Sequence, residues 1–273
     1  MLKNPSATKA QIIQWIRSYF AVNGKECMAI IGLSGGKDSA VAAALCVEAL
    51  GKDRVIGVFM PNGRQSDIAD AYDIAEHLDI KALTVNIKDM FHAFKNNISM
   101  GICDEIASAF INENRALEDF YYSVKETDQM LINLPPRIRM TTLYAIAQML
   151  PMGGRVVNTC NASEDYIGYS TKYGDAAGDF SPLSGLLVSE VMQIGDALGL
   201  PYDLVHKTPA DGLCGKTDED KLGFTYDYLE HYILCDGVAT DPTINAKIEW
   251  LHNVNLHKLK LIPNYHVDIT ERV

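Results

Sequence analysis

The feature that most limits how this chain can fold is a strand–turn–helix unit near its beginning. The short apolar run Cys27–Gly32 is typical of a buried strand. A glycine-rich turn follows it, and the alanine-rich segment Ser39–Leu50 then reads as a helix that ends at Gly51. A strand that leads directly into a helix in this way is the first half of a βαβ crossover, which joins parallel strands.

The same alternation recurs along the chain. We expect further strands at Val55–Met60, Leu83–Ile87 and Val156–Cys160, and a further helix at Asp67–Leu78. Apolar residues between positions 12 and 20 also repeat with helical spacing. Strands and helices in this order predict the α/β class, with a mostly parallel sheet and helices on both of its faces.

No repeat, low-complexity tract or proline-rich linker divides the chain, so we predict a single domain over residues 1–273. Residues 104–150 carry mainly helical periodicity and predict a helical insertion, which either forms a subunit interface or packs within the chain. The polar, glycine-rich stretches Asn161–Pro182 and Thr208–Asp220 read as long loops, and such loops in enzymes often cover substrate.

Composition argues against several classes of protein. The net charge of −11 and the pI near 5.0 disfavour a broad nucleic-acid surface, although a local basic site remains compatible with them. No apolar run is long enough to cross a bilayer, and the chain begins with an amphipathic helical pattern rather than a signal peptide. The 6 cysteines form no CxxC pair, and the 7 histidines show no zinc-ligand spacing. We therefore expect reduced thiols and a cytoplasmic protein.

The turn Ser34–Ser39, with the sequence SGGKDS, has the composition of a phosphate-binding site. Glycines let backbone N–H groups approach an anion, and the N-terminus of the following helix adds partial positive charge. A turn that only caps the helix is the alternative. The spacing fits neither the Walker A loop nor the GxGxxG fingerprint. Asp38 would repel phosphate unless a cation bridges the two, so this residue predicts magnesium bound with the nucleotide.

These six residues match the SGGxDS loop of the ATP pyrophosphatases, which cleave ATP between its α and β phosphates. The resemblance implies the adenine nucleotide α-hydrolase-like form of the α/β fold. Among these enzymes, the chain resembles the NAD synthetase family segment by segment from Arg137 to Lys258. On this resemblance, the residues that contact ATP are Gly32, Leu33, Ser34, Gly35, Gly36, Lys37, Asp38, Ser39, Thr159 and Ala210.

Two segments imply the metal ligand and the catalytic carboxylate. Asn158–Glu164 is similar to the family's strand end G-T-x-x-x-x-E, which assigns Glu164 to magnesium opposite Asp38. Ser170–Asp179 matches the family's element T-K-Y/F-G-D-x-x-x-D. There Asp175 lies beside the attacking ammonia, where a carboxylate can hold ammonium and help to remove its proton. The resemblance therefore makes Asp38 and Asp175 the catalytic candidates.

The substrate site is implied by the same element and by two others. A run of four residues, RIRM at 137–140, resembles the family's helix R-x-R-M-x-x-x-Y, and the pair His257-Lys258 resembles its HK motif. An arginine suits a carboxylate or phosphate because its guanidinium binds either in a bidentate manner. The residues that the resemblance assigns to deamido-NAD are Arg139, Tyr144, Tyr169, Lys172, Asp179, His257 and Lys258.

Three positions depart from the family pattern. Val188 stands where the family commonly has a lysine, so another cation must replace it if that lysine binds polyphosphate. Lys37, Lys207 and Lys216 are the candidates. Ala210 replaces a Ser or Thr, and Asn158 replaces a glycine. Neither removes a metal ligand.

The resemblance implies an ammonia-dependent ligase that converts deamido-NAD to NAD through an NAD-adenylate, releasing AMP and pyrophosphate. It also implies a homodimer, with the deamido-NAD site across its two-fold interface. The enzyme it implies is cytoplasmic and binds neither nucleic acid nor membrane. The resemblance uses the whole chain and leaves no segment for glutamine hydrolysis, so ammonia is free or comes from a separate glutaminase.

Another ATP pyrophosphatase, such as a tRNA-modifying enzyme, is the enzymatic alternative, although the acidic charge disfavours it. The second alternative is a nucleotide-binding sensor without catalytic activity, and the presence of both Asp38 and Glu164 disfavours this function.

Overall fold

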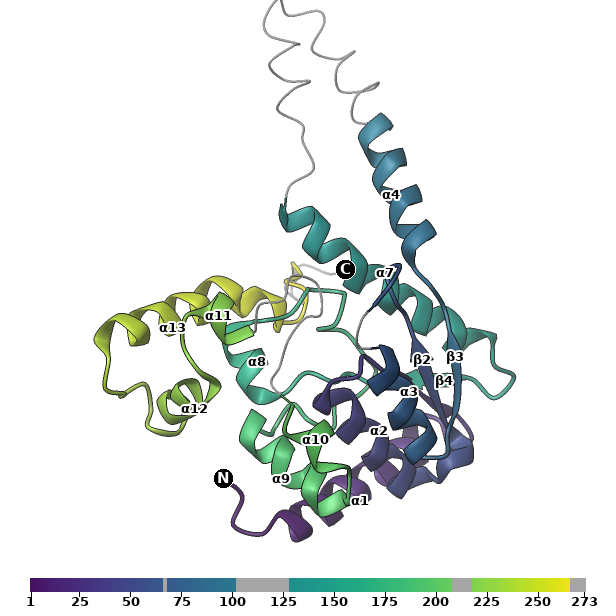
Figure 1. Ribbon diagram of the computed structural model, residues 1–273, viewed down its shortest axis with the longest axis horizontal. Coiled ribbons are helices and arrows are strands. Elements are labelled where there is room, and N and C mark those ends of the chain that lie inside the picture. The colour runs from purple at the N-terminus through teal and green to yellow at the C-terminus, as the bar shows by residue number, and fades with distance from the viewer. Residues whose placement is uncertain (66–67, 102–127, 208–217, 266–273) are drawn as a thin grey trace, which may run out of the picture.

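The computed structural model describes residues 1–65, 68–101, 128–207 and 218–265. The centre of this part is a parallel sheet with the strand order β3-β2-β1-β4 (Figure 1). The strands are β1 (Met28–Gly32), β2 (Val55–Phe59), β3 (Lys81–Thr84) and β4 (Gly154–Val156). Helices lie on both faces of the sheet, so the predicted α/β class is confirmed.

The first two strands agree with their predicted ranges to within one residue. The predictions for the third and fourth strands were wrong at both ends. Strand β3 begins two residues and ends three residues before its predicted range, and β4 begins two residues and ends four residues before its own. All four residues of β3 are exposed, so an apolar run could not mark this edge strand. Its place is set instead by pairing with β2, in the register Ile56 opposite Lys81.

Successive residues of β1 serve two cores, as the alternation of a strand requires. Ala29 and Ile31 belong to a core under the helices α1, α2, α3 and α9, whereas Ile30 belongs to a second core under α4 and α7. The bounds of these helices are α1 Pro5–Asn23, α2 Lys37–Leu50, α3 Ile68–His77, α4 Lys88–Gly101, α7 Asp128–Met149 and α9 Val188–Leu198. Helix α3 confirms the helix predicted at 67–78, and α7 confirms helix in the described part of 104–150. Residues 104–127 of the predicted insertion lie outside the described residues, and α4 was not predicted.

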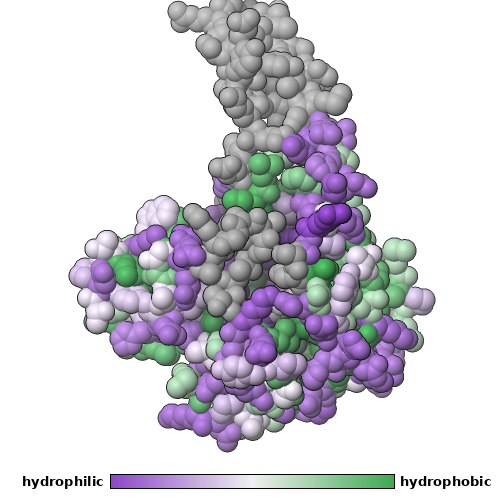
Figure 2. All heavy atoms as spheres, in the orientation of Figure 1, coloured by the Kyte–Doolittle hydropathy of each residue, from purple (hydrophilic) through white to green (hydrophobic). Residues whose placement is uncertain are grey.

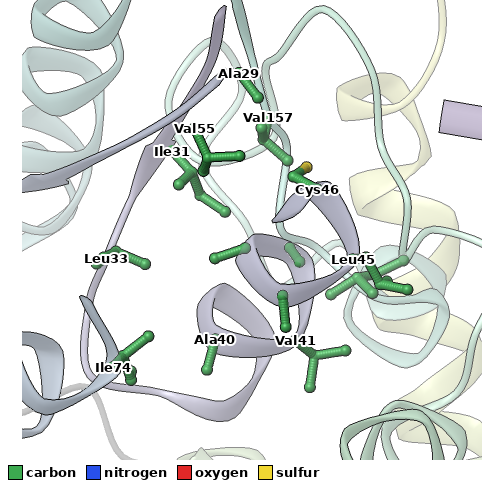
Figure 3. Close-up of a cluster of buried hydrophobic side chains, with 14 of the residues drawn as sticks. Ala29, Ile31, Leu33, Ala40, Val41, Leu45, Cys46, Val55, Ile74 and Val157 are labelled. Carbon is green, nitrogen blue, oxygen red and sulfur yellow. The ribbon is translucent and has the colours of Figure 1, made fainter. Parts of the chain in front are cut away.

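Helix α2 is the one that positions the phosphate turn, and it is held against the sheet by small side chains. Ala40, Val41 and Leu45 are fully buried. Figure 3 shows them gathered near Ile31 and Val55 of the first two strands. Because alanine lets the helix approach the sheet closely, the start of α2 is fixed directly beyond the end of β1.

The C-terminal helices form a third cluster beside the sheet, at the left of Figure 1. They include α8, which lies within the stretch predicted as a loop over 161–182. That prediction was therefore wrong over six residues, because a helix this short has too few turns to show periodicity. The remaining elements are α8 (Ala162–Ile167), α10 (Tyr202–Val205), α11 (Asp218–Leu222), α12 (Tyr226–Leu234), α13 (Pro242–Asn255), η1 (Lys52–Arg54) and η4 (Leu256–Lys258). The loop predicted at 208–220 lies outside the described residues up to 217, and its last residues begin α11.

The surface agrees with the charge of the chain. Figure 2 shows a face that is mostly hydrophilic, with hydrophobic side chains gathered over the start of α7. No helix in the described ranges is both long enough and apolar enough to cross a membrane.

Candidate active site

The SGGKDS turn lies where predicted, between the end of β1 and the start of α2. Gly35 has a φ of 85°, a conformation that a side chain would strain. Ser34 Oγ accepts a hydrogen bond from Gly36 N at 3.2 Å and lies 3.2 Å from Ser39 Oγ. Gly36 is the N-cap of α2 and provides no capping side chain, so the N-terminus of this helix faces the turn with backbone donors. This is the arrangement that an anion-binding turn requires.

A buried amide joins the two predicted metal ligands. Asn161 is fully buried, and its Nδ2 donates to Asp38 Oδ1 at 3.1 Å. Its side chain also accepts from Glu164 N at 3.0 Å, while Glu164 Oε2 accepts from Asn161 N at 3.2 Å. This reciprocal pair is a capping box at the start of α8. The structure therefore brings Asp38 of α2 and Glu164 of α8 to one place.

The charges at this place are unbalanced. The surrounding protein raises the pKa of Glu164 well above its ordinary value, and the nearby charge of Asp38 raises it further. Lys37 opposes both effects, and its Nζ lies 3.1 Å from Asp38 Oδ2. The ionised form of Glu164 is therefore disfavoured without a further positive charge beside it, and an added cation would stabilise both carboxylates together.

These residues fit a magnesium ion that is held jointly with a triphosphate. Magnesium prefers oxygen ligands and is usually bound by one or two carboxylates together with phosphate oxygens and water. Asp38 and Glu164 supply carboxylates of that kind. Within the described residues there is no group of three or more acidic, His or Cys side chains that could hold a metal without the nucleotide.

A second group of predicted residues gathers around Asp175. Although Asp175 as a residue is exposed, protein atoms surround its carboxylate and raise its pKa above the ordinary value. A hydrogen bond from Thr171 N at 3.0 Å and the charge of Lys258 oppose this rise. Burial lowers the pKa of Arg139 below its ordinary value, and the charge of Asp175 offsets part of this effect. The carboxylate of Asp175, in a loop, is thus within electrostatic reach of both Arg139 of α7 and Lys258 of η4.

The C-terminal pair fastens the loop that carries the other substrate residues. Lys258 Nζ donates to the carbonyls of Gly168 and Ser170 at 2.8 and 3.0 Å. Lys172 Nζ donates to the carbonyl of His257 at 2.9 Å. These bonds bring the TKYGD and HK motifs together across more than eighty residues of sequence. Both lysines are held by backbone oxygens, so a ligand would have to compete for them.

Three further predicted residues have structural partners. Tyr169 Oη donates to Asp218 Oδ1 at 3.1 Å, which ties the loop to the start of α11. Asp179 Oδ2 accepts from Val156 N at 2.7 Å, and Tyr144 Oη donates to Asp179 Oδ1 at 3.4 Å. Burial and this carboxylate raise the pKa of Tyr144 to about 12. Thr159 is half-buried after β4, and Ala210 lies outside the described residues.

Two residues of this site were missed or given too little weight in the sequence. Asn161 was not singled out, although the pattern Asn161 to Glu164 is the signature of a capping box. Asn158 was regarded only as a departure from glycine. It donates to the carbonyls of Asp175 and Ala177 at 2.8 and 3.1 Å, so it fixes the loop that carries Asp175. Gly178 makes room for it, since a Cβ there would lie 2.7 Å from that of Asn158.

Comparison with known proteins gives consistent matches. A family model described as NAD synthase matches residues 8–262. The NH(3)-dependent NAD(+) synthetase of Pyrococcus furiosus is 31% identical over 257 residues, which cover 93% of this chain and 90% of that protein. Among solved structures, NMN synthetase from Francisella tularensis is similar with a TM-score of 0.80 and 30% identity, covering 97% of this chain and 99% of that one. The NH3-dependent NAD synthetase from Campylobacter jejuni, solved with a nitrate ion, is similar with a TM-score of 0.69 and 25% identity, covering 97% of this chain and 100% of that one.

Proposed function

The chain belongs to the NAD synthase family, and we propose that it is a ligase that converts deamido-NAD to NAD with ATP and ammonia. The observation that carries the proposal is the meeting of Asp38 and Glu164 on Asn161, at the end of a phosphate-binding turn. The cluster of Arg139, Asp175 and Lys258 supports a second, anionic substrate nearby.

The proposed reaction has two steps. The nicotinate carboxylate attacks the α-phosphorus of ATP, giving an NAD-adenylate and pyrophosphate. Ammonia then attacks the activated carbonyl, an amide forms, AMP leaves, and one proton is lost. Adenylation is needed because a bare carboxylate repels nucleophiles and has a poor leaving group. The protein positions the two nucleotides and neutralises the charge of the polyphosphate.

Each group of residues has a part in these steps. The N-terminus of α2 binds phosphate oxygens through its backbone donors. Asp38 and Glu164 would hold magnesium, which when bound would neutralise phosphate charge. Arg139 and Lys258 orient the anionic substrate, with Tyr144, Tyr169, Lys172, Asp179 and His257 completing that site. Asp175 accepts a proton from the incoming ammonium, a role that its raised pKa favours.

We also propose the setting of the enzyme. It acts in the cytoplasm as a homodimer of single-domain chains and binds neither nucleic acid nor membrane. Its nitrogen source is free ammonia or ammonia from a separate glutaminase.

The test is turnover of ATP by the purified chain in the presence of deamido-NAD. We expect AMP, pyrophosphate and NAD in equal amounts with ammonium, and only background NAD with glutamine. Equal rates with glutamine would contradict the ammonia dependence. Formation of ADP in place of AMP would contradict the whole proposal.

One observation favours a second candidate function, the amidation of nicotinate mononucleotide to NMN. The NMN synthetase from Francisella tularensis has a higher TM-score to this chain, 0.80, than the NAD synthetase from Campylobacter jejuni, 0.69. Both products arise by the same chemistry on the same nicotinate carboxylate. The ratio of kcat/KM for deamido-NAD and for nicotinate mononucleotide, measured in one assay, decides between them.

A further inference from the structure

Lys37 occupies an unusual position for a lysine. It is the first residue of α2, and only 5% of its side chain is exposed. The N-terminus of a helix carries partial positive charge, so an ammonium is less favourable there than at the C-terminus. Burial of an unpaired ammonium would add a further penalty. Lys37 is therefore stable in this position only if anions lie close to it.

The anions that it meets are the carboxylates assigned to magnesium. Lys37 Nζ lies 3.1 Å from Asp38 Oδ2, and its charge also acts on Glu164. The other oxygen of Asp38 accepts from Asn161. Each oxygen of Asp38 thus already has one donor, and a metal ion that binds Asp38 would meet the positive charge of Lys37 beside it.

The surroundings supply a reason for a cation at this position. Helix α9 begins beside the carboxylates, because Val188 N donates to Ser163 Oγ at 3.2 Å, next to Glu164. The side chain of Val188, the first residue of α9, is buried in the apolar third cluster and carries no charge, and the one charged residue in the first turn of this helix is the acidic Glu190. Helix α9 therefore begins without a cation here. Lys207, another candidate, is paired with Asp70 at a separate cavity of about 380 Å³ between α3 and α10.

We propose that Lys37 is the counter-ion of Asp38 and Glu164 in the nucleotide-free enzyme and transfers to the polyphosphate of ATP when a divalent metal binds these carboxylates. This inference rests on the proposed function, since it takes ATP as the ligand of the turn. A single side chain then does two things. It keeps metal from binding firmly without nucleotide, and it adds a positive charge to the bound triphosphate.

The two roles predict effects of opposite sign when the charge is removed. In Lys37→Met, Mn²⁺ should bind about tenfold more tightly in the absence of nucleotide, because its competitor is lost. The affinity for α,β-methylene ATP, which cannot be cleaved at the reacting bond, should fall about tenfold, because a buried ion pair with phosphate is lost. Mn²⁺ binding is followed by the electron paramagnetic resonance of the free ion, and nucleotide binding by calorimetry.

Two variants act as controls. Lys37→Arg keeps the charge and should bind both ligands within about threefold of the wild type. Lys207→Met removes a lysine of the other site and should change neither isotherm. A variant that simply misfolds would lose both ligands, so opposite shifts cannot arise from loss of structure.

The inference is overturned if Lys37→Met leaves both affinities unchanged, or weakens both in a protein whose thermal unfolding matches the wild type. A wild-type protein that binds no α,β-methylene ATP contradicts the proposed function instead, and the Mn²⁺ isotherm still decides whether Lys37 competes for the carboxylates.

Discussion

Asp175 is the residue that we propose acts on ammonia, because its carboxylate is held in place and is more basic than usual. Thr171 N orients it, and the protein around it raises its pKa. Asp175→Asn keeps the shape and removes the base. We expect the amidation step to slow about a hundredfold, a typical contribution of a positioned base. Adenylation should continue, so pyrophosphate would appear without matching NAD.

The matched control is Asp203→Asn, which changes an exposed aspartate of α10. Equal loss of pyrophosphate and NAD in Asp175→Asn would exclude a role confined to amidation.

The pH dependence of the rate follows from the same carboxylate. Ammonia must be neutral to attack, so at fixed, subsaturating total ammonium the rate should rise toward alkaline pH. In the proposed reaction, ionised Asp175 binds ammonium, which would lower this dependence. Its pKa is raised, so it becomes protonated at a higher pH than a free aspartate as the solution is acidified. The wild type should therefore show a shallower slope near neutral pH than Asp175→Asn, with a steeper fall in acid. Parallel profiles for the two proteins would contradict a role in capturing ammonium.

At the scale of residues, the sequence allowed candidate site residues to be recognised by type and spacing, but it did not predict which groups they contact. The turn and the carboxylates Asp38 and Glu164 are recognisable because their types and spacing are restricted by phosphate and metal. Asn161 was missed because the value of an amide depends on which segments meet around it. The partners of Lys172 and Lys258 are backbone carbonyls far away in the chain, which no local pattern specifies.

At the scale of elements, α8 and α9 are joined by a buried carboxylate that has no role in the proposed reaction. Glu230 of α12 is 6% exposed. It accepts from Ser163 Oγ at 3.4 Å, from Ser189 N at 2.9 Å and from Ser189 Oγ at 2.5 Å. The N-terminus of α9 also attracts its charge. Since Ser163 precedes Glu164, this junction fixes the segment that carries Glu164, a proposed metal ligand, against the neighbouring helices.

Loss of that carboxylate should therefore destabilise the fold. Glu230→Ala leaves three donors without their acceptor, and we expect it to lower the free energy of unfolding by about 2–3 kcal/mol. Chemical denaturation at constant pH measures this. Asp227→Ala, an exposed acid on the same helix, should cost less than about 1 kcal/mol. Equal, small effects of the two substitutions would mean that the junction is held by its apolar contacts alone.

The elements differ in how well the sequence could predict them. Buried strands such as β1 and β2 have apolar runs as markers, and α2 and α3 have enough turns for their periodicity to show. The edge strand β3 is exposed and α8 has only six residues, so each depends on its neighbours for its position. The single-domain assignment stays a prediction.

At the scale of the whole molecule, α4 carries an apolar stripe on its outer side. Met90, Phe94 and Ile98 are spaced by four residues and are 40%, 53% and 43% exposed. Helical spacing places them on one face. Phe91 of the same helix packs into the core shared with α7. Ile132, in the first turns of α7, is a further exposed apolar residue, 63% accessible. An exposed stripe of this kind supports association with a second copy of the chain.

Phe94→Glu tests whether that stripe forms the proposed homodimer. Burial of a phenylalanine contributes about 1.5–3 kcal/mol, and a two-fold interface would lose it twice. A buried glutamate would add a desolvation penalty in each copy. We therefore expect the dimer dissociation constant to rise at least about a hundredfold, measured by sedimentation over a range of concentrations. Val22→Glu, at an 84% exposed position of α1, should leave the constant unchanged.

Because the family resemblance implies a deamido-NAD site across the interface, the KM for deamido-NAD should rise in the monomeric variant, while the affinity for ATP should stay the same. A wild type that is monomeric and fully active at assay concentration would refute the homodimer. A dimeric Phe94→Glu would leave the homodimer intact and exclude α4 as its interface.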